Sequence, residues 1–223
     1  ATWFGDNSGD AAGRSVAALG DVDRDGVPDV AIGSPFYDHK GTRDCGRVQI
    51  RSGESGKVLR QLFGRRAGER VGWAIASISA SRGFGQRLLA IGAEGGSEDE
   101  GASGAVYLVD AKRGRVVRRL ALGEEHDYFG GFVADLGDLD GDGDSELGVS
   151  AWNATVGDIR SGLVIVYSIK TGRELWRFGG RALHDRCGLA LTGIGDLDTD
   201  GVRDVAIGLP QDSVRGIGKI AIV

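Results

Sequence analysis

The chain has 223 residues, of which 41% are hydrophobic, and a formal net charge of −5. This length is sufficient for a hydrophobic core, and the sequence contains no run of eighteen apolar residues, which argues against a membrane-spanning helix. The 27 Lys and Arg residues are scattered and form no basic stripe. We therefore expect neither membrane insertion nor nucleic-acid binding.

The first part of the chain, approximately residues 4–62, has a distinct order of segments. It opens with Phe4-Gly5, and an apolar stretch from Ser15 to Gly20 then leads into an acidic loop. Three further short segments follow: Val30-Ala-Ile-Gly33, Arg47-Val-Gln-Ile-Arg51 and Lys57 to Leu62. Short apolar runs bounded by polar or glycine-containing turns are typical of β-strands.

The same order recurs at approximately residues 63–121, 122–177 and 178–223, with a period of about 58 residues. Glycine accounts for 40 residues, and no segment shows a convincing helical pattern. Repeated units of four short strands are typical of β-propellers, in which four-stranded blades surround an axis. We therefore predict an all-β fold, a single β-propeller domain over residues 1–223 with four four-stranded blades.

Three of the four units carry the same nine-residue acidic loop, at residues 21–29, 138–146 and 196–204. Carboxylates at positions 1, 3, 5 and 9 of a tight loop repel one another unless a cation lies among them. Ca²⁺ takes six to eight oxygen ligands, and glycine at position 6 permits a sharp turn. These loops are not EF-hands, because an EF-hand has Glu at position 12, which is apolar in all three loops (Ile32, Val149 and Ile207).

The spacing predicts three Ca²⁺ sites, in units one, three and four. Each site would use side-chain oxygens from positions 1, 3, 5 and 9 and the backbone carbonyl of position 7. The predicted ligands are Asp21, Asp23, Asp25, Val27 and Asp29 in unit one, Asp138, Asp140, Asp142, Asp144 and Glu146 in unit three, and Asp196, Asp198, Asp200, Val202 and Asp204 in unit four. Unit two keeps its Phe63-Gly64 opening, but its loop at 79–87 lacks carboxylates.

The run Phe-Gly, a small-residue first strand, Gly-Asp-x-Asp-x-Asp-Gly-x-x-Asp and then Val-Ala-Ile-Gly-x-Pro resembles the FG-GAP repeat of integrin alpha-subunit propellers. The resemblance covers nearly the whole chain. It implies calcium in only some blades, with a structural role. It also implies a binding or cell-adhesion scaffold whose ligand contacts the variable loops between strands.

Integrin-like propellers usually have seven blades, so four units depart from that pattern. Three alternatives follow: a closed four-bladed ring, two chains that share an eight-bladed ring as a homodimer, and a piece of a longer protein. In a closed ring, residues 1–3 would complete the last blade by strand exchange. Cys45 and Cys187 would be neighbours in such a ring and would form a disulfide, whereas their non-equivalent positions in the repeat favour two separate thiols.

We expect no enzymatic activity, because the sequence has no nucleophile elbow, phosphate-binding glycine loop or His-Glu-x-x-His motif. The alternative is an extracellular calcium-dependent carbohydrate-active enzyme, a lyase or hydrolase on a propeller. Loops of this kind suit the roughly millimolar calcium outside cells, so the expected location is extracellular, cell-surface or periplasmic. The expected partner is an extracellular protein or glycan. Trp152 opens the variable loop of unit three and is the aromatic residue best placed to contact it.

Overall fold

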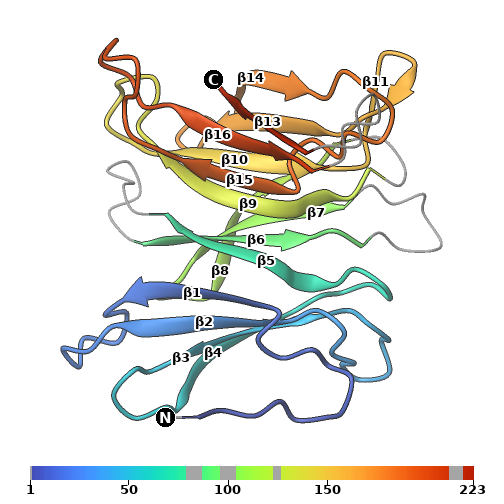
Figure 1. Cartoon of the computed structure of the whole chain (residues 1–223). Helices are drawn as coiled ribbons and strands as arrows, with labels where there is room; N and C mark the ends of the chain where they lie inside the picture. Colours follow the sequence, from blue (N-terminus) through green and yellow to red (C-terminus); the bar gives the residue numbers. More distant parts are fainter. Residues whose placement is uncertain (1, 79–86, 96–103, 123–126, 211–217) are drawn as a thin grey trace.

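The computed structural model describes residues 2–78, 87–95, 104–122, 127–210 and 218–223. In these ranges all regular secondary structure is β, and none of the described segments is a helix long and apolar enough to cross a membrane. Three four-stranded sheets, one three-stranded sheet and one two-stranded hairpin make up the fold (Figure 1). The predicted all-β architecture is confirmed.

The first two sheets are antiparallel, and their strands lie side by side in chain order. The first sheet contains β1 (Ser15–Gly20), β2 (Asp29–Ser34), β3 (Arg47–Arg51) and β4 (Val58–Phe63). The second sheet contains β5 (Val71–Ile78), β6 (Leu88–Ala93), β7 (Ala105–Asp110) and β8 (Arg115–Leu120).

The remaining two sheets follow the same antiparallel order. The third contains β9 (Phe129–Gly137), β10 (Glu146–Ala151), β13 (Leu163–Ser168) and β14 (Glu174–Gly179), and the fourth contains β15 (Ala190–Gly193), β16 (Val205–Leu209) and β17 (Lys219–Ile222). The variable loop of unit three forms an additional hairpin, β11 (Thr155–Val156) with β12 (Ile159–Arg160), which the sequence pattern did not predict. Each large sheet corresponds to one sequence unit, although β4 and β14 extend slightly beyond the approximate unit boundaries.

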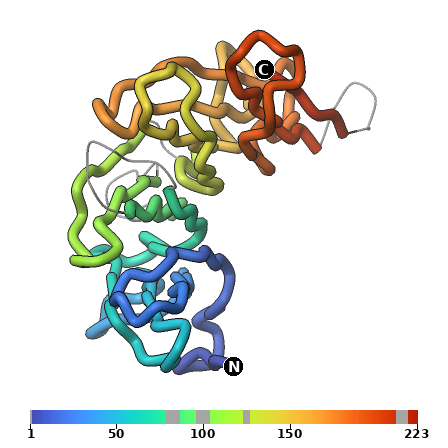
Figure 2. Tube along the Cα trace, turned by 90° about the vertical axis from the view of Figure 1, so that its left-hand side faces the viewer, coloured from blue at the N-terminus to red at the C-terminus, as the bar shows by residue number. Residues whose placement is uncertain are grey.

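The four sheets follow one another along an arc (Figures 1 and 2). Their first strands contact one another in succession, β1 with β5, β5 with β9 and β9 with β15. Sheets that radiate from a line of first strands are arranged like propeller blades. In the described part of the chain the first and fourth sheets lie at opposite ends of the arc (Figure 2), so the four blades do not form the closed four-bladed ring that was one alternative.

The hydrophobic core fills the three spaces between successive sheets. Ile50 of the first sheet packs in one cluster with Ile91 of the second, Leu108 of the second with Phe129 of the third, and Val166 of the third with Ile207 of the fourth. Every residue of β6, β10 and β13 is buried, because a sheet covers each face, and this explains their continuous apolar runs. In the two end sheets, β16 alternates between buried and partly exposed residues, and β2 does so over residues 29–33.

Cys45 and Cys187 are buried free thiols rather than a disulfide. Val71 N–H donates to the carbonyl oxygen of Cys45 at 3.0 Å, where the first sheet meets the second. Cys187 N–H donates to the carbonyl oxygen of Ser161 at 2.9 Å, where the third sheet meets the fourth. The two cysteines therefore lie at different junctions between sheets.

At the N-terminus, the guanidinium of Arg51 in the first sheet lies 5.9 Å from the ring centre of Trp3. The fourth sheet contains three strands in the described residues, and none of them comes from the N-terminus. Completion of that blade by residues 1–3 stays a prediction.

Candidate metal centres

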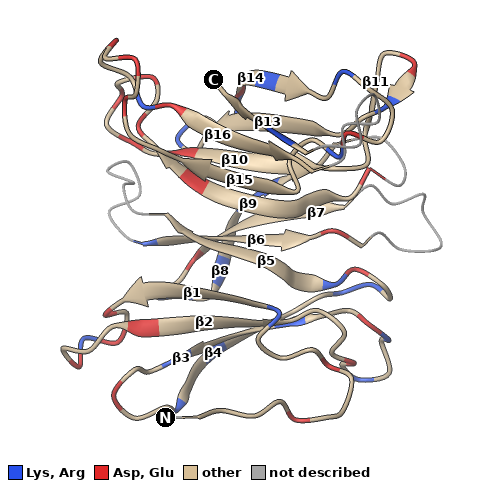
Figure 3. Ribbon diagram, in the orientation of Figure 1, with Lys and Arg blue, Asp and Glu red and all other residues tan. Residues whose placement is uncertain are grey.

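The acidic loops connect the first and second strands of the first, third and fourth sheets, and they lie along the same side of the row of sheets, on the left in Figure 3. Antiparallel pairing brings the two ends of each loop together. Gly20 pairs with Asp29, and Gly137 pairs with Glu146. Position 9 of each of these loops therefore lies beside position 1, which is how a nine-residue segment can direct several carboxylates to one point.

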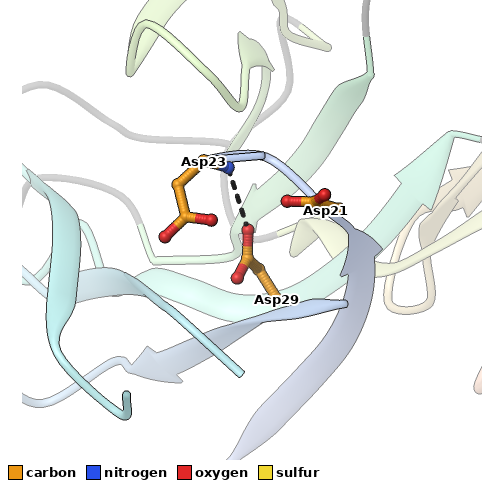
Figure 4. A group of neighbouring side chains, drawn as sticks. All are labelled: Asp21, Asp23 and Asp29. Carbon is orange, nitrogen blue, oxygen red and sulfur yellow. Dashed lines mark hydrogen bonds between the residues drawn. The ribbon is translucent and has the colours of Figure 1, made fainter. Parts of the chain in front are cut away.

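Each loop brings together the carboxylates of positions 1, 3 and 9. One oxygen from each lies within 4.8 Å of the others in the groups Asp21, Asp23 and Asp29, Asp138, Asp140 and Glu146, and Asp196, Asp198 and Asp204. Figure 4 shows the first group, in which the three side chains lie around a common space. The position-9 carboxylates of the first two groups are fully buried, whereas those of positions 1 and 3 are exposed.

Backbone N–H groups hold these carboxylates in place. The position-9 carboxylate accepts a hydrogen bond from position 2 at 2.6 Å in every loop, with Val22, Leu139 and Leu197 as donors. The position-1 carboxylate accepts one from the position-6 glycine, at 2.9 Å from Gly26, 3.0 Å from Gly143 and 2.9 Å from Gly201. These glycines have φ values of +91°, +86° and +92°, a conformation that a residue with a side chain resists.

The position-5 carboxylates are not part of these groups. Their Oδ1 atoms accept hydrogen bonds from the N–H of position 7, at 2.8 Å for Asp25, 2.9 Å for Asp142 and 2.7 Å for Asp200. Asp142 also pairs with Lys170, whose Nζ lies 3.1 Å from Oδ2. The structure thus brings together the carboxylates of positions 1, 3 and 9 in each loop, but not that of position 5. The metal-ligand roles of all the predicted residues, the position-7 carbonyls included, stay predictions.

The chemistry of the group in the third sheet fits a cation. Oε2 of Glu146 accepts the hydrogen bond from Leu139, but Oε1 is buried and has no hydrogen-bond partner in the described structure. Burial, and after it the charges of Asp140 and Asp138, raises the pKa of Glu146 to about 7. A divalent ion would neutralise this repulsion and supply a partner for the unpaired oxygen. An all-oxygen donor set is the one that Ca²⁺ prefers.

The FG-GAP repeat family matches residues 12–50, a range that includes the first acidic loop. Residues 12–50 thus match one FG-GAP repeat. Integrin alpha-V from Gallus gallus is 28% identical to it over 211 residues. The aligned region is 88% of this chain and 20% of the integrin, so the chain spans about a fifth of that relative's length.

Two solved structures share the fold of this chain at low sequence identity. The crystal structure of Saccharomyces cerevisiae Sqt1 matches with a TM-score of 0.52 and 18% identity, over 87% of this chain and 40% of that chain. The crystal structure of BBS1N in complex with ARL6DN matches with a TM-score of 0.54 and 10% identity, over 93% of this chain and 50% of that chain. The match thus spans half or less of each of these two chains.

The sequence analysis missed a second set of repeated carboxylates in the chain. Asp10, Glu69, Asp127 and Asp185 hold equivalent places before the first strand of each sheet, and all four are buried. Glu69 accepts hydrogen bonds from the N–H groups of Arg65 and Arg66 at 2.6 and 3.1 Å. Asp185 accepts two at 2.9 Å from the corresponding turn in unit four. Their recurrence with the period of the repeat was the available signal, and it indicates a structural role in this turn.

Trp152 lies at the start of the variable loop of unit three and is partly exposed. Its ring stacks on that of Tyr128 with 4.7 Å between ring centres, and the guanidinium of Arg186 lies 5.8 Å from it. The aromatic surface predicted to contact a ligand is thus supported by an aromatic neighbour and a cationic one.

Proposed function

We propose that the chain is a non-catalytic, calcium-stabilised binding module of the integrin alpha propeller type. The observation that carries the calcium part is the buried, unpaired Oε1 of Glu146 within a group of carboxylates. One Ca²⁺ in each of the three acidic loops would neutralise the clustered charge and cross-link the ends of two strands. The grouped side chains would hold the ion, and the position-5 carboxylates and position-7 carbonyls would complete its oxygen shell.

The ligand would bind on the opposite side from the metal loops. In each sheet the loop before the second strand is the acidic loop or its counterpart, so the loop after that strand leaves from its other end. The loops at 35–45 and 152–161 lie there, while those at 94–103 and 210–216 fall largely outside the described residues. Equivalent loops of successive blades meet on one surface, and variable loops on a rigid scaffold are suited to recognition. An extracellular protein or glycan is the proposed ligand, in an extracellular, cell-surface or periplasmic setting.

Calorimetric titration of the calcium-free chain with CaCl₂ tests the metal part. We expect three Ca²⁺ ions per chain. The chelated chain should also melt at a lower temperature, because a ligand at 100 times its Kd stabilises the folded state by about 2.7 kcal/mol per site. No binding heat together with an unchanged melting temperature would refute the calcium proposal.

Charge reversal in the β11–β12 hairpin tests the ligand part. The hairpin variant carries Asp158→Lys and Arg160→Glu together, and the control carries Arg60→Glu at an exposed position on the outer strand β4. Binding of both variants and of the wild type would be measured in millimolar calcium, on a glycan microarray and on immobilised extracellular-matrix proteins. We expect the hairpin variant to lose binding that the wild type and the β4 variant retain. Equal binding by all three chains would contradict the assignment of this surface.

The enzymatic alternative requires an acid–base pair. Glu94 is the best candidate acid, because burial raises its pKa to about 7. However, Trp152 and Arg70 enclose its carboxyl group, and the residue is only 4% exposed. Incubation with pectate, alginate and hyaluronan in calcium, followed by assays for unsaturated products and reducing ends, should show no turnover. Turnover abolished by Glu94→Gln would favour the enzyme instead.

A further inference from the structure

The β9–β10 loop, residues 138–146, is more acidic than the other two acidic loops. It contains five carboxylates and no Lys or Arg, whereas residues 21–29 and 196–204 each contain four carboxylates and one arginine. The additional carboxylate is Asp144 at position 7, where the other two loops have valine, and this residue is only 2% exposed. A carboxylate buried among others is stable only beside a positive charge or hydrogen-bond donors.

Lys170 brings a positive charge to this loop from another part of the sheet. It lies in the turn between β13 and β14, and its Nζ is 3.1 Å from Oδ2 of Asp142 and 3.9 Å from Oδ2 of Asp144. The N–H of Gly172 donates to the carbonyl oxygen of Ser168 at 2.7 Å and closes this turn. The ammonium group thus pairs with the carboxylates of positions 5 and 7.

The oxygen that Lys170 contacts is the one that position 5 has left for a metal ion. In all three acidic loops, Oδ1 of position 5 already accepts the N–H of position 7. In the β1–β2 loop, Oδ2 of Asp25 accepts a hydrogen bond at 3.0 Å from the hydroxyl group of Ser52, a neutral donor that can rotate away. Oδ2 of Asp142 contacts an ammonium group instead, and this group would repel a divalent cation at the same carboxylate.

The turn that carries Lys170 recurs in the first two sheets with other neighbours. In each turn a glycine N–H donates to the carbonyl oxygen four residues earlier, at 2.7 to 2.9 Å, so Glu54, Lys112 and Lys170 hold equivalent places. Glu54 accompanies an acidic loop, and Lys112 accompanies the loop at 79–87, which lacks carboxylates. Of these three turns, only that of Lys170 combines a cation with an acidic loop, and Lys112 provides a matched control.

We propose that Lys170 competes with Ca²⁺ for the β9–β10 loop, as an internal counter-ion that holds Asp142 without calcium and leaves it when the ion binds. This inference rests on the calcium sites of the proposed function. Lys170 is 47% exposed, so its ammonium group can return to water at little cost. The loop still attracts an ion, because the buried Oε1 of Glu146 has no hydrogen-bond partner in the described structure even with Lys170 in place. Lys170 therefore lowers the calcium affinity of the loop and sets the concentration at which it fills.

Calcium binding by Lys170→Gln tests this role, because the substitution removes the charge and keeps a long polar side chain. All chains in this comparison would carry Asp23→Asn and Asp198→Asn, which weaken the other two sites and isolate the β9–β10 loop. Calorimetric titration with CaCl₂ should give a Kd about tenfold lower for Lys170→Gln than for the chain with Lys170. Lys170→Arg keeps the charge and Lys112→Gln lies beside no acidic loop, so both should leave the Kd close to that of the chain with Lys170.

Thermal unfolding in EDTA gives a second measurement with the opposite sign. Lys170→Gln removes a positive charge beside the buried Asp144, so without calcium it should melt at a lower temperature than the wild type, whereas Lys112→Gln should not. Calcium should then raise the melting temperature of Lys170→Gln by more than that of the wild type. A lower melting temperature in EDTA with an unchanged or higher Kd would overturn the proposal, because Lys170 would then only support the fold. If no chain bound calcium, the wild type included, the proposed function itself would be refuted.

Discussion

Trp152 donates a hydrogen bond from Nε1 to Oε2 of Glu94, at 3.4 Å, across the junction between the second and third sheets. On the other side of this carboxyl group, Nη1 of Arg70 lies 3.9 Å from Oε1. Burial raises the pKa of Glu94 to about 7, although Trp152 and Arg70 both act to lower it. A carboxyl group that takes up a proton near neutral pH is thus held between two blades.

We expect Glu94 to make the fold less stable as the pH rises from about 4.5 to about 7. Its pKa is raised above the ordinary value of 4.5 in the folded chain, so the folded state binds more protons than the unfolded state in this range. The stabilisation is complete below the unfolded pKa and is lost as the pH passes the folded one. Urea unfolding of the wild type and Glu94→Gln across this range, in saturating calcium, measures the effect. The Glu94→Gln chain should lack this part of the pH dependence. If its free energy of unfolding changed with pH in parallel with that of the wild type, the role of Glu94 would be contradicted.

Asp140→Asn should weaken the calcium site of the third sheet without disturbing the fold of the calcium-free chain. The side chain is exposed and contributes one oxygen to the group that includes Asp138 and Glu146. At calcium concentrations near 100 times the Kd, loss of the site should remove up to about 2.7 kcal/mol of stabilisation. Melting temperatures with calcium and with EDTA check this, with Asp158→Asn as a control carboxylate outside the loops. A decrease in melting temperature of the same size in calcium and in EDTA would show that Asp140 stabilises the fold independently of a metal.

Gly92→Ala should destabilise the chain by about 1–3 kcal/mol or more, because the new methyl group would collide with the backbone of Gly130. A backbone carbonyl cannot rotate away as a flexible side chain can. Gly195→Ala is the matched control, since a Cβ there meets nothing within 4 Å and its φ is not in the left-handed region. Denaturant midpoints of both variants provide the comparison, and similar midpoints would argue against the close contact between blades.

Both thiols should be unreactive in the folded chain. Burial, and after it the charge of Asp185, raises the pKa of Cys187 to about 12, and burial also raises the pKa of Cys45. Since the thiolate is the nucleophile, an aromatic disulfide reagent at mildly alkaline pH should titrate neither cysteine in native conditions and both in urea. Rapid release of one equivalent of the reagent's aromatic thiolate in native conditions would show that one of the two cysteines is accessible.

Much of the fold followed from local chemistry. The strand order within a unit and the equivalence of the units were readable because short apolar runs and glycine turns recur with a constant period. The grouping of Asp21 with Asp29 was also predictable, because a tight hairpin necessarily returns its last residue to its first. The β11–β12 hairpin was not predicted, since two-residue strands leave no periodic pattern.

The sequence by itself determined that the chain is all-β, that it repeats, and that three of its four units concentrate carboxylates, because these properties depend on residues close together in the chain. Only the tertiary structure decided that the four sheets form an open arc with the two cysteines at separate junctions. It also showed that Oε1 of Glu146 lacks a partner and that Glu94 lies between Trp152 and Arg70. These features depend on how one blade packs against the next, and that packing is set by contacts between residues of different repeats, which no local pattern records.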